Sequence, residues 1–411
     1  MTGAEIYAYR LSRELAKNNK VSVFYRINDP ARREYEVVRT SYDGLDVYKI
    51  NNTLKECNSL DKIYRNGKVD DKFSEVLDEV RPDIVHAHHL LFLSMGILDE
   101  LKRRGIPVVF TLHDYWLVCP RGQLLKNNLE LCGNPLEANC LSCLASGLNY
   151  RTILRKMTKF LNAPRPADRF RVDIRGVCGK VDLFISPSRF LRGRFMEFGV
   201  PGEKIIYSEN GMDLDLFRDT EKTKSDMVRF GFIGTLIPSK GPHVLINAFN
   251  RLKGGRAVLK IYGKGPFNNG IFDYCRRIKR MAAKNKNIKF EGVFDNNAAA
   301  GIFKEIDALV FPSLWEENAP LVLREAALTK TPVIASDVGG VSEAMVCEDF
   351  LFRRGDSRGL FDKMSLFIGN QAGWGRPDFN FAPVKDLSGN SKEIEAIYKN
   401  LVTGKREGVV C

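Results

Sequence analysis

The chain has 411 residues, of which 44% are hydrophobic and 27% are charged. Because one hydrophobic core rarely organises so long a chain, we expect two globular domains of roughly 200 residues each. No uncharged run approaches the roughly 18 apolar residues that cross a bilayer, and the first residues lack a signal-peptide pattern, which predicts a cytoplasmic protein. The net charge of +13 favours anionic partners, although a merely soluble protein can also carry a basic surface.

The chain opens with "TGAEIYAYRLSREL", which is typical of an amphipathic helix rather than of a strand. A doubly wound domain normally starts with a central strand of about six residues, and its loss would leave two neighbouring strands unpaired. We therefore expect that the natural chain begins further upstream and that its first strand is missing here.

Short apolar runs rich in β-branched residues recur along the chain, and most are separated by stretches with apolar residues three and four positions apart. This alternation predicts parallel α/β layers. Gly and Pro residues at 197–204 mark a boundary, so we expect one doubly wound domain at 1–201 and a second at 202–385. The segment 386–411 would form a final helix, and a ligand cleft would lie between the two domains. The runs are 21–27, 83–89, 107–113, 182–188, 204–210, 228–234, 257–263, 288–294, 307–313 and 332–337.

Four histidines stand at the ends of predicted strands in the first half of the chain. His113 is followed by an acid and would lie at the expected cleft, although a single histidine after a strand is more often structural. His86 and His88 share one face of a strand, because alternate residues do so. We interpret these two, with His89, as structural.

Cys119, Cys132, Cys140 and Cys143 lie within 25 residues in a stretch rich in Gly, Asn and Pro. The final Cys-x2-Cys pair with two further thiolates is typical of tetrahedral zinc. The longer spacings are irregular, so a structural zinc and buried reduced thiols both stay open. A disulfide is the least expected outcome in a cytosolic chain.

The segment "LNYRTILRKMTKFL" at 148–161 has apolar residues on one helical face and basic residues largely off it. Such a helix suits the surface of an anionic membrane. Its apolar face would equally suit packing on its own domain.

Two stretches at strand ends have the composition of phosphate-binding loops. In "FIGTLIPSKGPH" a turn at Gly234 follows a strand, and Lys240 then stands beside a glycine bend that can hold phosphate. The residue order of a P-loop is absent. Gly263, at the end of another strand, is a second place where a nucleotide can approach the backbone.

The stretch "SLWEENAPLVLREA" at 313–326 lies between two apolar runs and carries three carboxylates. Pro320 suits the first turn of a helix and Asn318 its N-cap, which predicts an anion site at the helix start. Glu317 in the loop and Glu325 in the helix suit the hydroxyl groups of a sugar, because a carboxylate accepts hydrogen bonds. From the spacing alone, capping and salt bridges explain them equally well.

Together these motifs resemble the retaining glycosyltransferases of family 4, which have the two-domain GT-B fold. "PSLWEENAPLVLREA" resembles the family's Glu-x7-Glu motif, "TGAEIYAYRLSREL" its first glycine loop and helix, "TLHDYWLVCPRG" its histidine loop and "FIGTLIPSKG" its phosphate loop. "SENGMD" and "PVIASDVGGVSE" match two further segments, so the resemblance spans nearly the whole chain in order. It implies that the final helix crosses back to the first domain.

The resemblance implies a donor site for a UDP- or GDP-linked sugar. Lys240 would pair with the diphosphate, Glu325 would hold the ribose and Glu317 would contact the sugar. Thr235 stands where the family usually has arginine, which leaves one charge fewer on the leaving group. The other expected contacts are Gly3, Gly234, Gly263, His113 near the transferred sugar, and the backbone of Asn318, Ala319, Pro320 and Leu321.

The resemblance further implies transfer with retention of anomeric configuration, without a cofactor and without a metal at the reaction centre. Lys240 and the helix start would stabilise the departing diphosphate, which would help to deprotonate the acceptor hydroxyl. The basic segment at 148–161 suggests a lipid-linked acceptor, so the expected acceptor is a glycan or a lipid-linked molecule in the synthesis of cell-envelope polysaccharide such as lipopolysaccharide. This would bring the protein to the inner face of the cytoplasmic membrane.

Two alternatives stay open. One keeps the GT-B fold but makes the protein a sugar-nucleotide epimerase, against which the Glu-x7-Glu loop argues. The other is a non-enzymatic basic protein that binds zinc and nucleic acid. It would need aromatic residues interleaved with arginine and lysine, which we find only at 148–175, so we expect no nucleic-acid partner.

Overall fold

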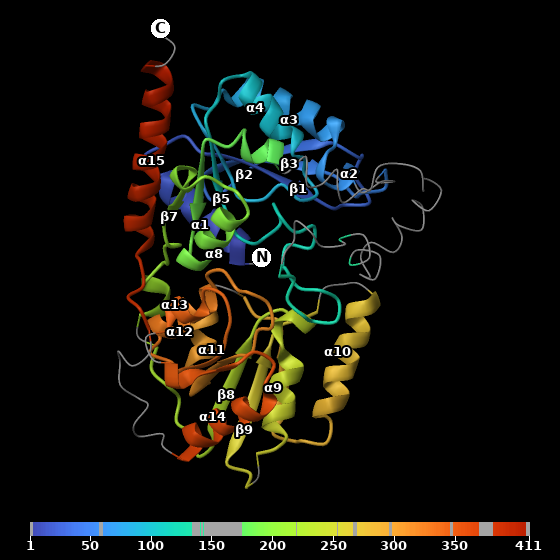
Figure 1. Ribbon diagram of the computed structural model, residues 1–411, viewed down its shortest axis with the longest axis vertical. Coiled ribbons are helices and arrows are strands. Elements are labelled where there is room, and N and C mark those ends of the chain that lie inside the picture. The colour runs from blue at the N-terminus through green and yellow to red at the C-terminus, as the bar shows by residue number, and fades with distance from the viewer. Residues whose placement is uncertain are drawn as a thin grey trace. The chain divides into compact units, whose positions relative to one another are not determined.

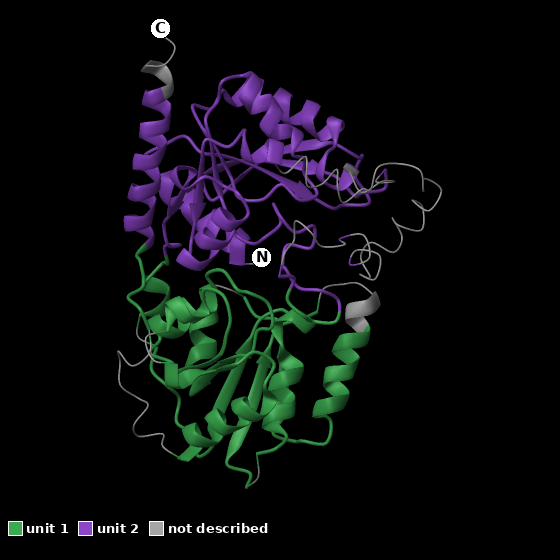
Figure 2. Ribbon diagram, in the orientation of Figure 1, with its two compact units in different colours: residues 1, 128–131, 212–386 green, residues 2–127, 132–211, 387–411 purple. Residues whose placement is uncertain are grey.

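The chain divides into two compact units, each of which alternates strands and helices (Figures 1 and 2). Unit 1 comprises Met1, Asn128–Leu131 and Met212–Asp386, and unit 2 comprises Thr2–Asn127, Cys132–Gly211 and Leu387–Cys411. The computed structural model describes residues 3–56, 61–133, 140, 143, 175–218, 220–252, 254–265, 269–295, 298–345, 348–369 and 381–407. The basic segment predicted at 148–161 lies outside the described residues.

Unit 1 is built on a parallel sheet with the strand order β10-β9-β8-β11-β12-β13. Its central strands are continuous buried apolar runs, because parallel strands are covered on both faces. The strands are β8 (Val228–Ile233), β9 (Ala257–Tyr262), β10 (Ile288–Gly292), β11 (Ala308–Phe311), β12 (Val333–Asp337) and β13 (Leu351–Arg353).

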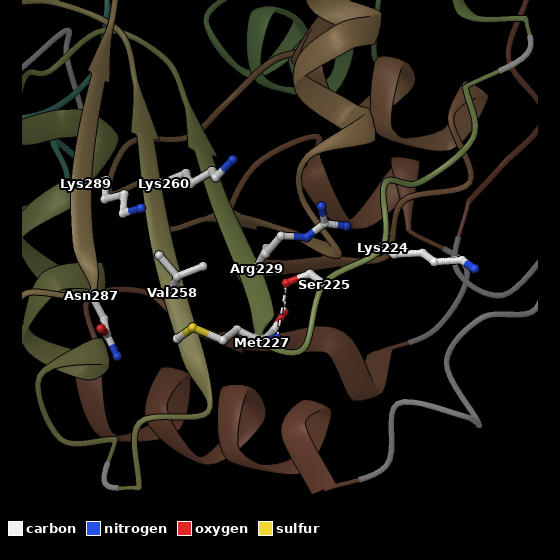
Figure 3. A pocket seen from close by; sticks show the side chains of 8 residues that line it. All are labelled: Lys224, Ser225, Met227, Arg229, Val258, Lys260, Asn287 and Lys289. Atoms are coloured by element: carbon white, nitrogen blue, oxygen red, sulfur yellow. Dashed lines mark hydrogen bonds between the residues drawn. The ribbon is translucent and has the colours of Figure 1, made fainter.

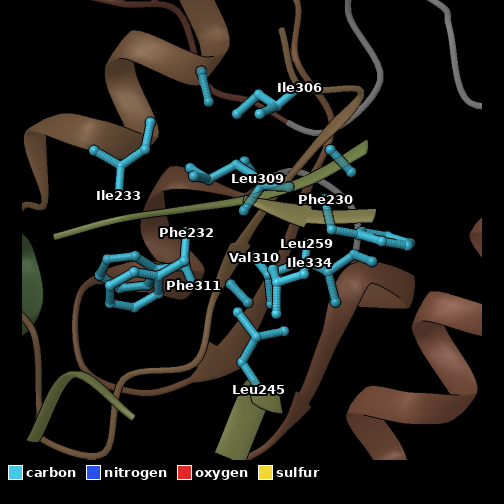
Figure 4. Packing of buried hydrophobic residues seen from close by; sticks show 14 of the residues in the cluster. Phe230, Phe232, Ile233, Leu245, Leu259, Ile306, Leu309, Val310, Phe311 and Ile334 are labelled. Atoms are coloured by element: carbon cyan, nitrogen blue, oxygen red, sulfur yellow. The ribbon is translucent and has the colours of Figure 1, made fainter. Parts of the chain in front are cut away.

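Helices that follow the strands of unit 1 close its core (Figure 4). Phe230 of β8 has its ring centroid 6.5 Å from that of Phe249 in α9 and 5.7 Å from that of Phe367 in α14. These contacts hold α9 and α14 on one face of the sheet. The helices are α9 (Pro242–Phe249), α10 (Asn269–Ala282), α11 (Ala299–Lys304), α12 (Leu321–Leu328), α13 (Val341–Ala344) and α14 (Ser357–Gly369).

Unit 2 has two sheets, where a single doubly wound sheet was expected. In one, β1 and β3 are parallel and β3 and β2 antiparallel; the other is parallel, with the order β4-β5-β6-β7. β1 and β4 each end a sheet, and no described strand pairs with their outer edges. The strands are β1 (Ser22–Ile27), β2 (Val37–Tyr42), β3 (Leu45–Asn51), β4 (Val85–Ala87), β5 (Val108–Thr111), β6 (Leu183–Ser186) and β7 (Ile205–Tyr207).

The helices of unit 2 include the predicted amphipathic helix at the start of the chain. Asn66 caps α3 by accepting a hydrogen bond from the backbone N–H of Lys68 (3.2 Å), and Ser188 caps α8 through Leu191 N (3.1 Å). No described helix is both long and apolar enough to span a bilayer. The helices are α1 (Gly3–Leu15), α2 (Asp61–Tyr64), α3 (Gly67–Val80), α4 (Gly96–Arg103), α8 (Arg189–Glu197) and α15 (Leu387–Glu407).

Each predicted apolar run contains a strand, but the hairpin of β2 and β3 was not predicted. Asp43 and Gly44 connect these strands with φ of 50° and 77°, which suits a two-residue hairpin turn. The first domain boundary also differs from the expected one, which followed residue 201. It falls after Gly211, because β7 pairs with β6 and so belongs to unit 2.

The side chain of Asn390, near the start of α15, joins this helix to the rest of unit 2. It is fully buried and uses both its oxygen and its nitrogen in hydrogen bonds. Its Oδ1 accepts from Tyr7 Oη (2.9 Å) and Gly211 N (3.2 Å), and its Nδ2 donates to Ser208 Oγ (3.3 Å) and Glu209 O (3.0 Å). One amide therefore ties α15 to α1 and to the segment that precedes unit 1.

We predict that Asn390→Ala lowers the free energy of unfolding by roughly 2–4 kcal/mol, because it leaves several buried polar groups without a partner. Asn400→Ala is the matched control, since Asn400 is exposed on the same helix. Urea unfolding followed by circular dichroism measures both. Equal effects of the two substitutions would contradict the role of Asn390.

Candidate active site

The carboxyl ends of β8 and β11 meet where the strand order of unit 1 reverses. From β8 the chain continues to β9 and β10 on one side, and from β11 it continues to β12 and β13 on the other. Ligands of doubly wound sheets bind at such a switch point. Gly234 and Lys240 follow β8, and Glu317 follows β11, so three predicted site residues belong to the two loops that border it.

Lys240 and Glu317 form an ion pair at this switch point. Lys240 Nζ donates to Glu317 Oε1 at 2.6 Å, and the ammonium lies 5.3 Å from the centroid of the Trp315 ring. Ser313 Oγ and Trp315 Nε1 donate to the same oxygen, each at 2.6 Å. Glu317 is only 3% exposed, and these three donors replace the water that a buried carboxylate loses.

The backbone around the pair is held by neighbouring loops. Leu314 N donates to Ser239 O (2.7 Å), which ties the loop after β11 to the residue before Lys240. Gly340 N donates to Glu317 O (2.7 Å). Gly339 has a φ of 54°, and a Cβ there would lie 2.2 Å from Glu317 O, so only glycine allows this approach.

Gly263 brings the end of β9 against the loop after β8. Its φ is 137°, and a Cβ at this position would lie 1.9 Å from Gly234 O. Gly234 N donates to Tyr262 O (3.0 Å), and Gly263 N donates to Gly292 O (2.6 Å). The two predicted glycines therefore pack strand ends together, and their N–H groups are used within the fold.

The sequence predicts Pro320 in the first turn of the helix of the Glu motif, but the helix begins one residue after this proline. α12 starts at Leu321, because Pro320 has a ψ of 117° and stays outside the helix. Asn318 is therefore not the N-cap, which corrects the sequence interpretation; it is buried in the preceding loop. Glu325 lies half-buried in the second turn of α12, and the helix start has N–H groups without an acceptor inside the helix.

The remaining predicted donor residues differ in exposure. Thr235 is exposed in the loop after β8, and Ala319 is half-buried before α12. Gly3 is the first residue of α1 and is exposed. Gly3 and His113 belong to unit 2, whereas Lys240, Glu317 and the other donor residues belong to unit 1.

His113 belongs to a stack of three imidazoles in unit 2. Its Nε2 is 3.0 Å from His88 Nδ1, and the ring centroids of His88 and His86 are 4.3 Å apart. His86 Nδ1 lies 2.5 Å from Tyr398 Oη of α15, and the Tyr7 ring meets His113 edge-on at 5.9 Å. Burial lowers the pKa of His88 to about 4 and lowers the pKa of His86 and His113 well below 6.5, so all three are neutral at pH 7.

The predicted zinc ligands do not form a metal site among the described residues. No group of three or more His, Cys, Asp or Glu side chains in this part of the chain is arranged to hold a metal ion. Arg121 Nη1 donates to Cys143 Sγ at 3.6 Å, and burial raises the pKa of the Cys119 and Cys132 thiols. The residues on either side of Cys140 lie outside the described part of the chain. A structural zinc stays a prediction.

Several residues around the Lys240–Glu317 pair and in the histidine stack were not predicted as site residues. Ser313 and Trp315 share the Glu317 carboxylate, and their alternate positions in an extended segment were a signal for a common face. His88 was predicted only as structural, although it is the hydrogen-bond partner of His113. Gly339 lies in a segment singled out by resemblance, but its contact with Glu317 has no signal in the sequence.

Two α/β units, one of them a doubly wound sheet, are the architecture of the GT-B fold, which the similar solved structures share. The chain belongs to glycosyltransferase family 4. Residues 1–216 match the model described as Glycosyltransferase Family 4, and residues 228–370 match the model described as Glycosyl transferases group 1.

Three of the similar proteins each match most of the chain. An "uncharacterized 42.6 kDa protein in cps region" of Klebsiella pneumoniae is 25% identical over 307 residues, which cover 74% of this chain and 69% of that protein. Sucrose-phosphate synthase from Thermosynechococcus elongatus has a TM-score of 0.66 at 18% identity and covers 99% of this chain and 92% of its own. Anabaena HepE in complex with UDP and glucose has a TM-score of 0.60 at 17% identity, covering 99% and 95%. At these identities the two structures show the fold alone.

We predict that Gly263→Ala lowers the free energy of unfolding of unit 1 by roughly 2–4 kcal/mol, because the added Cβ meets the backbone of Gly234. Gly254→Ala is the control: its φ of 95° is also positive, but no atom lies within 4 Å of the new Cβ. We expect about 1 kcal/mol there. Thermal and urea unfolding measure both variants, and the difference between them gives the free-energy cost of the backbone contact apart from that of the positive φ. Equal losses of stability in the two variants would contradict the close approach.

We predict that stability falls as the pH is lowered from about 6.5 towards about 4. The pKa of His88 is lowered on folding, so the unfolded chain binds the proton first, and the stabilisation present above about pH 6.5 is lost on acidification. His88→Gln removes one such group. The loss of stability between about pH 7.5 and pH 5 should then be about 2 kcal/mol smaller than in the wild type. An unchanged pH dependence in urea unfolding would contradict a buried neutral His88.

Proposed function

We propose that the protein transfers a sugar from a nucleoside-diphosphate sugar to a glycan or lipid-linked acceptor, with retention of anomeric configuration and without a metal at the reaction centre. The observation that carries this proposal is the ion pair of the half-buried Lys240 with the buried Glu317, in the loop that leads into α12. Family membership supports sugar transfer, and the similar HepE structure is a complex with UDP and glucose.

The leaving diphosphate needs positive potential that is in position before the bond breaks. Lys240 has three N–H donors, of which one contacts Glu317, so two can contact phosphate oxygens. The N–H groups and positive dipole end of α12 add a second source of stabilisation. Lys240 and the start of α12 follow two strands that meet at the same switch point. Together they would lower the free energy of the departing diphosphate.

Glu317 is the proposed contact of the donor sugar. Its Oε1 accepts three hydrogen bonds, whereas no described residue donates to Oε2. A sugar hydroxyl can donate to that second oxygen. Glu325, half-buried on α12, is proposed to accept from the ribose, and His113 is proposed to lie at the transferred sugar as a neutral imidazole.

The proposed setting is the synthesis of cell-envelope polysaccharide, with UDP or GDP as the leaving group. The Klebsiella relative is described as a protein of the cps region, and the net charge of +13 suits anionic donors and an anionic membrane surface. A peripheral position at the inner face of the cytoplasmic membrane would bring the protein to a lipid-linked acceptor.

We predict that Lys240→Ala lowers turnover of the preferred nucleotide sugar at least about 100-fold, because it removes a cation from the leaving group. A panel of UDP- and GDP-sugars, followed by nucleotide release, identifies the donor in the wild type. Lys284→Ala is the control, since Lys284 is exposed in the same unit. Near-wild-type turnover by a folded Lys240→Ala protein would sink the proposed role.

The same assay tests the stereochemistry and the metal. Proton NMR of the first product should show the anomeric configuration of the donor, and turnover should persist after dialysis against a chelator. An inverted product or complete dependence on an added divalent cation would contradict those parts of the proposal while leaving sugar transfer intact.

A further inference from the structure

A hollow lined by four cations lies on the sheet of unit 1, away from the switch point (Figure 3). Its volume is about 320 Å³, within the range of small-ligand pockets. Arg229 is the second residue of β8, so about five residues, or roughly 16 Å of strand, separate it from Gly234 at the other end. The lining residues are Lys224, Ser225, Met227, Arg229, Val258, Lys260, Asn287 and Lys289.

Strand register brings three of these cations to one face of the sheet. Arg229 pairs with Val258 across β8 and β9, and Lys260 pairs with Lys289 across β9 and β10. The next residues along the strands, Phe230 and Phe290, point to the other face. There Phe230 contacts α9, and the ammonium of Lys279 in α10 lies over the Phe290 ring. The hollow is therefore on the face opposite α9 and α10.

The charges in the hollow are only partly balanced. Arg229 donates to both oxygens of Asp307 (2.7 and 3.1 Å), and Lys260 donates to Glu305 (2.7 Å). Lys224 and Lys289 are exposed, and neither has an ion pair with a described residue. Two of the four cations therefore have no ion pair with a described residue, although Glu291 is close enough to Tyr262, which shares Glu305 with Lys260, to help raise the pKa of its hydroxyl.

Neighbouring strands lie about 4.8 Å apart, so Lys260 and Lys289 extend from adjacent positions and their positive charges repel each other. Glu305, which pairs with Lys260, offsets part of this repulsion, and a bound anion would offset more. Ammonium groups are common ligands of phosphate, and each offers up to three donors. Asn287 adds an amide to the same hollow. Lys260, Lys289 and Asn287 come from neighbouring segments of the hollow and offer donors to a phosphate group, and Lys224 lies on its other side with its side chain extending away from them (Figure 3).

We propose that this hollow binds a phosphate-bearing ligand and is a second anion site, distinct from the donor site at Lys240. The ligand is either a soluble phosphorylated molecule or the headgroup of an anionic lipid, which share the phosphate chemistry. The proposal does not depend on the sugar-transfer reaction.

The test compares Lys224→Gln/Lys289→Gln with Lys284→Gln/Lys286→Gln, which removes the same charge from exposed residues outside the hollow. Both pairs are made in a Lys240→Ala background, which removes the lysine of the switch point. Calorimetry with inorganic pyrophosphate probes a soluble ligand. Sedimentation with phosphatidylglycerol–phosphatidylcholine vesicles, against vesicles of phosphatidylcholine alone, probes a lipid headgroup.

We expect the Lys224/Lys289 pair to weaken binding at least about tenfold and the Lys284/Lys286 pair to change it by less than about twofold. This difference with pyrophosphate would identify a soluble ligand, and with vesicles alone a lipid headgroup. Equal effects of the two pairs would show diffuse attraction to a basic surface and overturn the proposal. Absence of binding to either probe by the parent protein would also overturn it. Thermal unfolding checks that all variants are folded.

Discussion

The buried carboxylate of Glu317 is the constraint on which the site in unit 1 depends. At 3% exposure it is stable only because three donors converge on one oxygen. Two of them, Ser313 and Trp315, come from its own loop, but Lys240 comes from a loop 77 residues earlier. The ion pair therefore exists only because β8 and β11 are neighbours at the reversal of strand order.

The loops around this pair contact each other mainly through backbone. Gly339 packs on Glu317 O, Gly263 packs on Gly234 O, and Leu314 N binds Ser239 O. Backbone contacts of this kind leave little room for the loops to shift without losing hydrogen bonds. The loops that carry Lys240 and Glu317 are thus held in place by the fold, as the proposed stabilisation of a leaving group requires.

The sequence predicted most of the strands because a strand buried on both faces is a continuous apolar run. It failed at β2 and β3, which lack a continuous apolar run, and at the three-residue β13, although Asp43-Gly44 is a strong hairpin signal. The residue type of Asn318 predicts a cap, yet the backbone of Pro320 decides where α12 begins. The pairing of Lys240 with Glu317 could not be predicted from spacing, because it depends on which strands are adjacent.

The cations on the helices of unit 1 and those on its strands are stabilised in different ways. In βαβ units the helices end near the amino ends of strands, so basic residues in a last turn, such as Lys279 and Arg280 of α10, are stabilised by the helix dipole. That explanation does not apply to Lys260 and Lys289, which stand within strands and point to the face opposite α10. Glu305 pairs with Lys260, whereas Lys289 has no ion pair with a described residue, so its ammonium can contact an anion from outside the fold.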